Sequence, residues 1–216
     1  MELKKVDVAY SSDPWWYDVR GFLILTFAYR TTLWSQIGLF SHNMGARHLE
    51  AAIGTGTLFE LVLRWRRLRR RSASSVVGFD YADRMLAGAQ HRFRKEQDIE
   101  LIKADISVLP FANGEFDTVN IANAIHCVPD VDSGLRELRR VLKVGGTLAG
   151  NVLLEPATQS FANRIARRIN AWGIRKGILN RPYTRDEIRR LVLANGFVFQ
   201  NEIVDGNSYS FVVVAT

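Results

Sequence analysis

The chain has 216 residues, 47% of them hydrophobic, a formal net charge of +7 and a single cysteine, Cys127. This length suits one globular domain, and the hydrophobic content excludes a disordered chain. A single cysteine excludes an intramolecular disulfide and a cysteine-rich zinc site. The first residues are charged and lack the apolar core of a secretion signal, and the longest apolar stretch, residues 21–29, is too short to cross a bilayer. We therefore expect a cytoplasmic protein without a membrane span.

The first 45 residues are rich in aromatic side chains and hold no cofactor motif. We expect them to form a helical lid that packs on or over the active site. Tyr10, Trp15, Trp16 and Tyr17 could contact a cationic ligand and shape an acceptor pocket, because aromatic faces attract cations. Tyr10 and Tyr17 are therefore candidate catalytic residues, with ordinary packing of an N-terminal helix as the alternative.

A glycine turn follows the apolar segment that begins at His48. Gly54 and Gly56 allow the backbone to turn tightly and to approach a ligand, and the helix after the turn offers unpaired N–H groups to an anionic moiety. The next apolar run, residues 76–79, ends at Asp80, whose carboxylate can accept hydrogen bonds from both hydroxyls of a ribose. Strand, glycine turn, helix, strand and carboxylate in this order predict a site for a nucleotide-type cofactor.

Downstream of Asp80 the pattern alternates helices with strands. The predicted elements are a helix over 82–93, a helix over 131–142, and strands over 197–204 and 209–214. Thr184 and Glu187 match a capping box and open a further helix before the last two strands. Alternation of this kind implies a parallel sheet covered on both faces, closed here by an antiparallel strand pair.

The order and spacing of these motifs resemble those of the class I S-adenosylmethionine-dependent methyltransferases, from about residue 48 to 216. The residues that carry the resemblance are Glu50, Ala52, Gly54 and Gly56, then Asp80, Lys103 to Ile106, the strand 116–121, the loop 123–130 and the turn Gly145-Gly146 before a fifth strand. The resemblance implies an α/β, Rossmann-like fold, with a mostly parallel seven-stranded sheet, helices on both faces and an antiparallel last strand. It also implies a single domain over 1–216, with an N-terminal helical lid over 1–45 and a cofactor-binding core over 46–216.

Two residues depart from the family's first motif. Ala52 stands where the family usually has glycine, and Glu50 where it more often has aspartate. Alanine is small enough for the close approach of a ligand, but it disfavours a positive φ. Ile53 stands where small or thiol side chains are common, so we expect it to point away from the ligand, into the sheet or a neighbouring helix. These departures leave open a binding module that keeps the fold without turnover.

The resemblance implies S-adenosylmethionine as the cofactor and S-adenosylhomocysteine as its product. The sulfonium makes the methyl group electrophilic, so the protein mainly has to place a nucleophile in line with it. By resemblance, Gly54, Thr55 and Gly56 line the methionine part, Glu50 anchors its amino end, Asp80 binds the ribose hydroxyls, Asp105 binds the adenine amino group, and Ile106 packs beside the ring. Asn123 is expected near the sulfonium, and the remaining cofactor candidates are Ala52, Tyr81 and Met85.

His126 lies in the loop that enters the predicted active site. A histidine there can act as a general base when the acceptor arrives protonated, and a histidine packed in the core is the alternative. His42, His48 and His91 lack the carboxylate or thiolate spacing that is typical of a metal site, so we assign no metal.

Basic residues gather in two clusters. Six arginines between residues 64 and 71 share the end of one helix, where a solvated face matched to the helix dipole is favoured over a phosphate-binding patch. The second cluster comprises Arg164, Arg167, Arg168, Arg175 and Lys176. Only Phe161 and Trp172 lie near it as aromatic side chains that could stack on bases. A nucleic-acid partner is therefore the weaker alternative to a small-molecule acceptor.

Methylation of a nitrogen, oxygen or carbon atom of a small molecule is the preferred interpretation, and the oligomeric state stays open. An RNA or protein methyltransferase would place the arginine clusters around the mouth of the cofactor site. Non-methyl chemistry on the same cofactor, by internal displacement, would release methylthioadenosine in place of S-adenosylhomocysteine.

Overall fold

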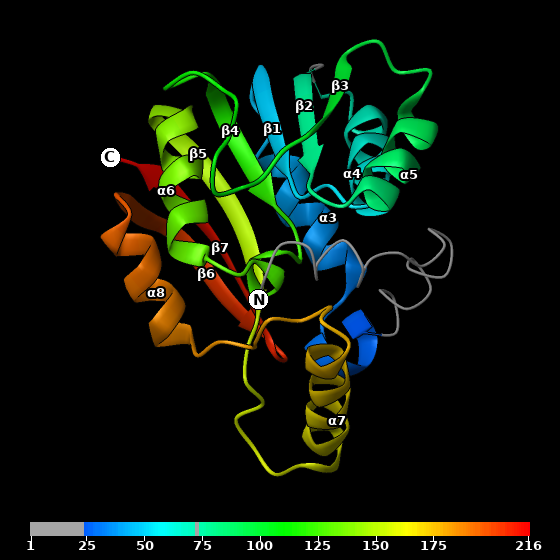
Figure 1. Ribbon diagram of the computed structural model, residues 1–216, viewed down its shortest axis with the longest axis vertical. Helices are drawn as coiled ribbons and strands as arrows, with labels where there is room; N and C mark the ends of the chain where they lie inside the picture. The colour runs from blue at the N-terminus through cyan, green and yellow to red at the C-terminus, as the bar shows by residue number, and fades with distance from the viewer. Residues whose placement is uncertain (1–23, 72–73) are drawn as a thin grey trace.

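The computed structural model describes residues 24–71 and 74–216 (Figure 1). The aromatic residues of the predicted lid, Tyr10, Trp15, Trp16 and Tyr17, lie outside the described residues. The strands are β1 (Arg47–Ala51), β2 (Ser75–Asp80), β3 (Ile99–Lys103), β4 (Phe116–Ile121), β5 (Leu142–Leu153), β6 (Phe197–Asp205) and β7 (Ser208–Ala215). They form one seven-stranded sheet in the order β3-β2-β1-β4-β5-β7-β6.

The helices surround this sheet. They are the π-helical η1 (Leu25–Tyr29), α3 (Leu33–His42), α4 (Thr57–Leu68), α5 (Asp83–Phe93), the short η2 (Ile125–Cys127), α6 (Val131–Val141), α7 (Phe161–Arg175) and α8 (Arg185–Ala194). The predicted capping box is confirmed, because the Thr184 hydroxyl accepts a hydrogen bond from the Glu187 N–H at 3.2 Å and the Glu187 carboxylate accepts one from the Thr184 N–H at 2.8 Å.

The strand directions confirm the predicted fold class. Strands β1 to β5 pair in parallel, and β7 runs antiparallel to both β5 and β6. The structure differs from the prediction at Gly145-Gly146, which lie inside β5 and not in a turn before it. The pairing of β4 with β5 shifts register between Phe116 and Thr118, so the two glycines occupy an irregular start of the strand.

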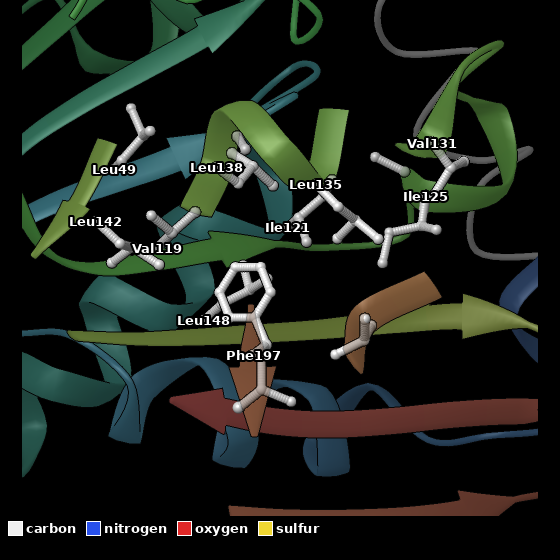
Figure 2. Close-up of a cluster of buried hydrophobic side chains, with 14 of the residues drawn as sticks. Leu49, Val119, Ile121, Ile125, Val131, Leu135, Leu138, Leu142, Leu148 and Phe197 are labelled. Carbon is white, nitrogen blue, oxygen red and sulfur yellow. The ribbon is translucent and has the colours of Figure 1, made fainter. Parts of the chain in front are cut away.

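Apolar side chains alternate between the two faces of the sheet, as the pleat of a strand requires. Leu49 and Val119 belong to the core under α6 and α8, whereas Val76 belongs to the core under α3, α4 and α5. Figure 2 shows the first of these cores, with Leu135 and Leu138 of α6 packed over the strands. Both faces are therefore covered, which leaves the ends of the strands as the place for a site.

The described part of the predicted lid, residues 24–45, divides in two. Helix η1 packs against α7 beyond the carboxyl ends of the parallel strands (Figure 1). Helix α3 instead packs against α4, and its Phe40 is buried in the core on that face of the sheet. Within the described residues, η1 is thus the part of this segment that covers a strand end, and α3 belongs to the helix layer.

Candidate functional site

The strand order reverses between β1 and β4, and a cavity of about 330 Å³ opens at the carboxyl ends of these strands. Ligands of open α/β sheets bind at such a point. Ten of the predicted cofactor residues line the cavity, namely Glu50, Ala52, Gly54, Thr55, Asp80, Tyr81, Met85, Asp105, Ile106 and Asn123. Gly56 is the predicted cofactor residue that does not. His126 also lines this cavity.

The turn after β1 holds three residues with a left-handed backbone, Ala52 (φ 52°), Gly54 (φ 60°) and Gly56 (φ 77°). A Cβ on Gly54 would meet no atom within 4 Å, so a ligand in the cavity can approach the backbone there. A Cβ on Gly56 would lie 2.4 Å from the Phe93 ring, so this glycine is required by packing at the start of α4. Ala52 adopts the positive φ that alanine disfavours, at a cost of about 1 kcal/mol.

Ile53 packs its side chain into the sheet. Its Cδ1 lies 2.9 Å from the position that a Cβ of Gly78 would take, so the absence of a side chain on β2 makes room for it. The residue joins the core under α4 while part of it borders the cavity. The departure at Ile53 is therefore accommodated by Gly78.

Asp80 ends β2 with its carboxylate at the cavity wall. Oδ2 accepts a hydrogen bond from the Gly54 N–H at 2.8 Å, and Oδ1 accepts one from the Ala82 N–H at 2.9 Å. Burial raises the pKa of Asp80 to about 6, against the opposing effect of these N–H donors. The carboxylate thereby ties the glycine turn to the start of α5, and each oxygen keeps a lone pair for a ligand hydroxyl.

Glu50 is a second buried carboxyl group at the cavity. Its Oε2 lies 3.2 Å from Nε2 of His48, whose Nδ1 lies 2.8 Å from the hydroxyl of Thr118. Burial raises the pKa of Glu50, and the hydrogen bond with His48 partly opposes this shift. A ligand ammonium group beside Glu50 would favour the charged carboxylate, because opposite charges stabilise each other in a buried site.

Asp105 and Ile106 follow β3 and line the part of the cavity next to Tyr81 and Met85. Oδ1 of Asp105 accepts a hydrogen bond from the Ser107 N–H at 2.8 Å, which fixes the carboxylate in a tight turn. Ile106 packs against Gly134, 3.5 Å from the position of a Cβ there. An apolar wall beside one oriented carboxylate can hold a planar ring that carries an amino group.

Three carboxamides fix the loop after β4. The Asn123 N–H donates to Oδ1 of Asn151 at 2.7 Å, and the Asn123 side chain exchanges hydrogen bonds with Gln36 at 2.9 and 3.1 Å. Gln36 and Asn151 are buried, and Asn123 has a positive φ of 55°. The network therefore holds Asn123 in an otherwise disfavoured conformation beside the cavity.

Tyr29 of η1 and His126 of η2 meet at the cavity wall. The Tyr29 hydroxyl is hydrogen-bonded to Nε2 of His126, and the Leu153 N–H donates to Nδ1 at 3.3 Å. Because Nδ1 accepts a hydrogen bond, the ring proton is assigned to Nε2. Burial lowers the pKa of His126 to about 3, which keeps the imidazole neutral at physiological pH.

Tyr29 and Asn170 are cavity residues that the sequence analysis did not find. Asn170 of α7 is 5% exposed, and its Nδ2 has no hydrogen-bond partner in the part of the chain that the structure describes. An unpaired buried amide costs free energy, so at a cavity it is a candidate contact for a ligand. The signal in the sequence was the inward stripe of an amphipathic helix, formed by Asn163, Ala166, Asn170 and Gly173.

Apolar side chains form most of the wall around Tyr29 and Asn170. They include Leu33, Val128, Leu153, Ile169, Ile178 and Leu179. They come from α3, β5, α7 and the connecting loops, segments that lie outside the glycine turn and the carboxylates. This half of the cavity can therefore bind an apolar group next to the half that holds the predicted cofactor residues.

The first arginine cluster makes contacts within the fold. Arg66 is buried, in contrast to the expected solvated face, and donates to the Ser41 carbonyl at 2.8 Å. Arg64 and Arg67 pair with glutamates at 2.6 Å. The second cluster lies on or next to α7, with Arg164, Arg168 and Arg175 exposed. Among the described residues, no arginine or lysine lines the cavity.

Across residues 24–71 and 74–216, no group of three or more His, Cys, Asp or Glu side chains could hold a metal ion. No helix in these same ranges is long and apolar enough to cross a membrane.

Comparison with known proteins agrees with the fold. Residues 49–150 match the family described as a methyltransferase domain. A demethylmenaquinone methyltransferase of Thermus thermophilus is 39% identical over 103 residues, which cover 47% of this chain and 44% of that protein. The chain spans about a third of the length of the first curated relatives that it matches.

Solved structures show the same fold. A possible histamine N-methyltransferase of Thermotoga maritima has a TM-score of 0.66 at 18% identity, covering 92% of this chain and 96% of that one. The cyclase SpnF also has a TM-score of 0.66, at 16% identity, covering 84% of this chain and 80% of that one. The domain match, the relatives and the solved structures together support a class I S-adenosylmethionine-dependent methyltransferase.

Proposed function

We propose that the protein transfers the methyl group of S-adenosylmethionine to a nitrogen, oxygen or carbon atom of a small, largely apolar molecule. The observation that carries this proposal is the division of one cavity into two halves. Gly54, Asp80 and Asp105 border one half, and an apolar wall with Tyr29 and Asn170 borders the other. The open space at Gly54 and the oriented carboxylate of Asp80 fit a cofactor with a ribose.

The residues of the chain would mainly bind, orient and exclude water. When bound, S-adenosylmethionine supplies an electrophilic methyl group, and holding a nucleophile in line with it can lower the barrier by several kcal/mol. His126 is a weak base because its pKa is lowered to about 3, so we assign it the role of orienting the Tyr29 hydroxyl. Tyr29 would then contact the acceptor, and proton transfer is needed only for an acceptor that arrives protonated.

The N-terminal aromatic residues belong to the same proposal. Tyr10 and Tyr17 would complete the cover over the acceptor half, as part of a single domain whose described cover begins at η1. A fold of this class does not by itself fix the reaction, and one structural neighbour is named a cyclase. The alternatives of RNA or protein methylation, internal displacement on the cofactor and binding without turnover are therefore outcomes of the test.

Asn170 offers a variant that separates a ligand contact from a structural role. Asn170→Leu removes a buried amide whose Nδ2 has no hydrogen-bond partner among the described residues and keeps the size of the side chain, so the free energy of unfolding should rise by about 1–3 kcal/mol. If the amide binds an oxygen of the acceptor, kcat/KM should fall by about tenfold or more while the affinity for S-adenosylhomocysteine stays unchanged.

The assay supplies S-adenosylmethionine with apolar amines, phenols and quinols, with an RNA oligonucleotide and with a protein mixture. The proposal is supported if S-adenosylhomocysteine forms only when an apolar small molecule is present, and if Asn170→Leu forms it more slowly than the parent protein. Methylated RNA or protein, or full activity of a stabilised Asn170→Leu, contradicts it. The control is Asn195→Leu, on an amide at the end of α8 that does not line the cavity.

A further inference from the structure

Residues 156–185 form one segment with a large excess of positive charge. This segment contains no acidic residue and seven basic ones, Arg164, Arg167, Arg168, Arg175, Lys176, Arg181 and Arg185. The whole chain has 29 Lys and Arg and 22 Asp and Glu. Removing the seven leaves 22 basic against 22 acidic residues, so the rest of the chain is neutral in sum. The charge of this segment thus equals the net charge of the whole chain, and two of its arginines, Arg181 and Arg185, pair with Glu187 and Glu202 outside it.

Helix α7 carries four of these basic residues, and three of them are exposed on the side that faces away from the cavity. Phe161, Arg164, Arg168, Ala171 and Arg175 are exposed and recur every three or four residues, so they form one stripe, which Ile174 extends. We call these six residues the outer face of α7. Phe161 is 77% exposed and Ile174 45%, so a large apolar side chain lies near each end of the charged stripe.

We propose that the outer face of α7 docks on the surface of a bilayer that contains anionic lipids. Arginine side chains attract anionic headgroups, and their long stems let the helix lie at the interface while exposed apolar side chains enter the acyl boundary. Phe27 of η1, which packs against α7, is 49% exposed and adds a further apolar group. A nucleic acid suits this face less well, since Phe161 is the one aromatic side chain that it offers to bases.

The opposite side of α7 borders the cavity through Ile169, Asn170 and Gly173. Figure 1 shows α7 at the end of the molecule, beyond the carboxyl ends of the strands and apart from the helices that flank the sheet. Docking of the outer face would thus bring the apolar half of the cavity close to the lipid surface. The docking itself does not depend on the proposed methyl transfer and can be measured without it.

The test is sedimentation of the full chain with vesicles of phosphatidylcholine alone and of phosphatidylcholine mixed with about one third phosphatidylglycerol. We expect sedimentation with the mixed vesicles only, and its loss as salt is raised. Arg164→Glu/Arg168→Glu should weaken this binding by about tenfold or more, because two attractive charges become repulsive. Phe161→Ser keeps the charge and should weaken it by a smaller factor.

The control is Arg94→Glu/Lys95→Glu, which makes the same change in net charge at two exposed residues after α5. It should bind the mixed vesicles as the parent protein does, and melting curves should show that all variants are folded. The proposal is overturned if the parent protein ignores anionic vesicles, if the control loses binding as much as the α7 variant, or if an RNA oligonucleotide binds and the vesicles do not.

Discussion

The hydroxyl of Tyr29 and Nε2 of His126 share a hydrogen bond between residues 97 positions apart in the chain. It joins η1, which precedes the cofactor core, to the loop that follows β4, and the Leu153 N–H completes the support of the imidazole ring. Tyr29 and His126 are both buried and line the cavity. The hydrogen bond thus holds Tyr29 of η1, the helix beyond the strand ends, against His126 in the loop after β4.

Tyr29→Phe tests what the hydroxyl does. We expect the turnover number for methyl transfer to fall by about tenfold, the effect of losing one positioned hydrogen bond, while the affinity for S-adenosylhomocysteine changes little. Enzyme kinetics and calorimetry measure the two quantities. Tyr183→Phe is the matched control, because Tyr183 is buried but does not line the cavity. If a folded Tyr29→Phe protein kept full turnover, the hydroxyl would have no part in the reaction and Tyr29 would contribute packing alone.

The raised pKa of Asp80 predicts a pH dependence of cofactor binding. Ligand hydroxyls favour the ionised carboxylate, so the affinity for S-adenosylhomocysteine should rise as pH rises through about 6. Between about pH 7.5 and about pH 5 we expect an affinity loss of about tenfold, and Asp80→Asn should bind weakly at both values. Calorimetry across this range measures it. If the affinity of Asp80→Asn fell by the same factor over this pH range, the titrating group would be Glu50 and the prediction would be wrong.

The same shift predicts an opposite trend in the stability of the protein without ligand. The pKa of Asp80 is about 6 in the folded state and 3.8 ordinarily, so the folded protein binds more protons in this window than the unfolded chain. The contribution of Asp80 to the free energy of unfolding should therefore be fully present below about pH 4 and be lost as pH rises through about 6.

Gly54→Val should abolish binding of S-adenosylhomocysteine. The added side chain has open space around it, and that space is the cavity in which the ligand would lie. A left-handed φ also strains valine, so the matched control is Gly145→Val, which has a φ of 78°, no atom within 4 Å of its Cβ and no part in the cavity. Binding by Gly54→Val equal to that of the Gly145 variant would place the ligand elsewhere.

Ala52→Gly should stabilise the protein. Glycine adopts a φ of 52° without the strain of about 1–2 kcal/mol that alanine has, and this relief exceeds the backbone entropy cost of about 0.5–1 kcal/mol. We therefore expect a net gain of up to about 1 kcal/mol, or an increase in Tm of up to about 4 °C for a chain of this size. Cofactor binding should be retained. Ala51→Gly, one residue earlier in β1, should instead lower the stability by about 0.5–1 kcal/mol. Thermal denaturation measures both, and a lower Tm for Ala52→Gly would refute the strain.

The sequence predicted the residues that follow each strand and missed those brought in by tertiary packing. Gly54 and Asp80 were found because they lie at or just after the end of a strand, and the carboxyl ends of parallel strands meet at one edge. Asp105 was found from its place in the ordered motifs of the family. Tyr29 and Asn170 belong to helices that no motif marks, and their place at the cavity depends on how η1 packs against α7.

Arg66 and Gly145 show the same limit within regular elements. Helical spacing placed Arg66 among exposed arginines, but the approach of α3 buries it against the Ser41 carbonyl. The pair Gly145-Gly146 is typical of a turn, yet the register shift between β4 and β5 draws it into a strand. In both cases a partner element distant in the chain decides the local environment.

The most direct test of the account is the fate of the methyl group. The protein is incubated with S-adenosylmethionine labelled in its methyl group and with apolar amines, phenols and quinols, and mass spectrometry identifies the spent cofactor and the labelled product. Gly54→Val is the negative control and Gly145→Val the positive one. We predict S-adenosylhomocysteine and one labelled small molecule, formed by the parent protein and by Gly145→Val only. Release of methylthioadenosine, or label found only in RNA or protein, would contradict the account.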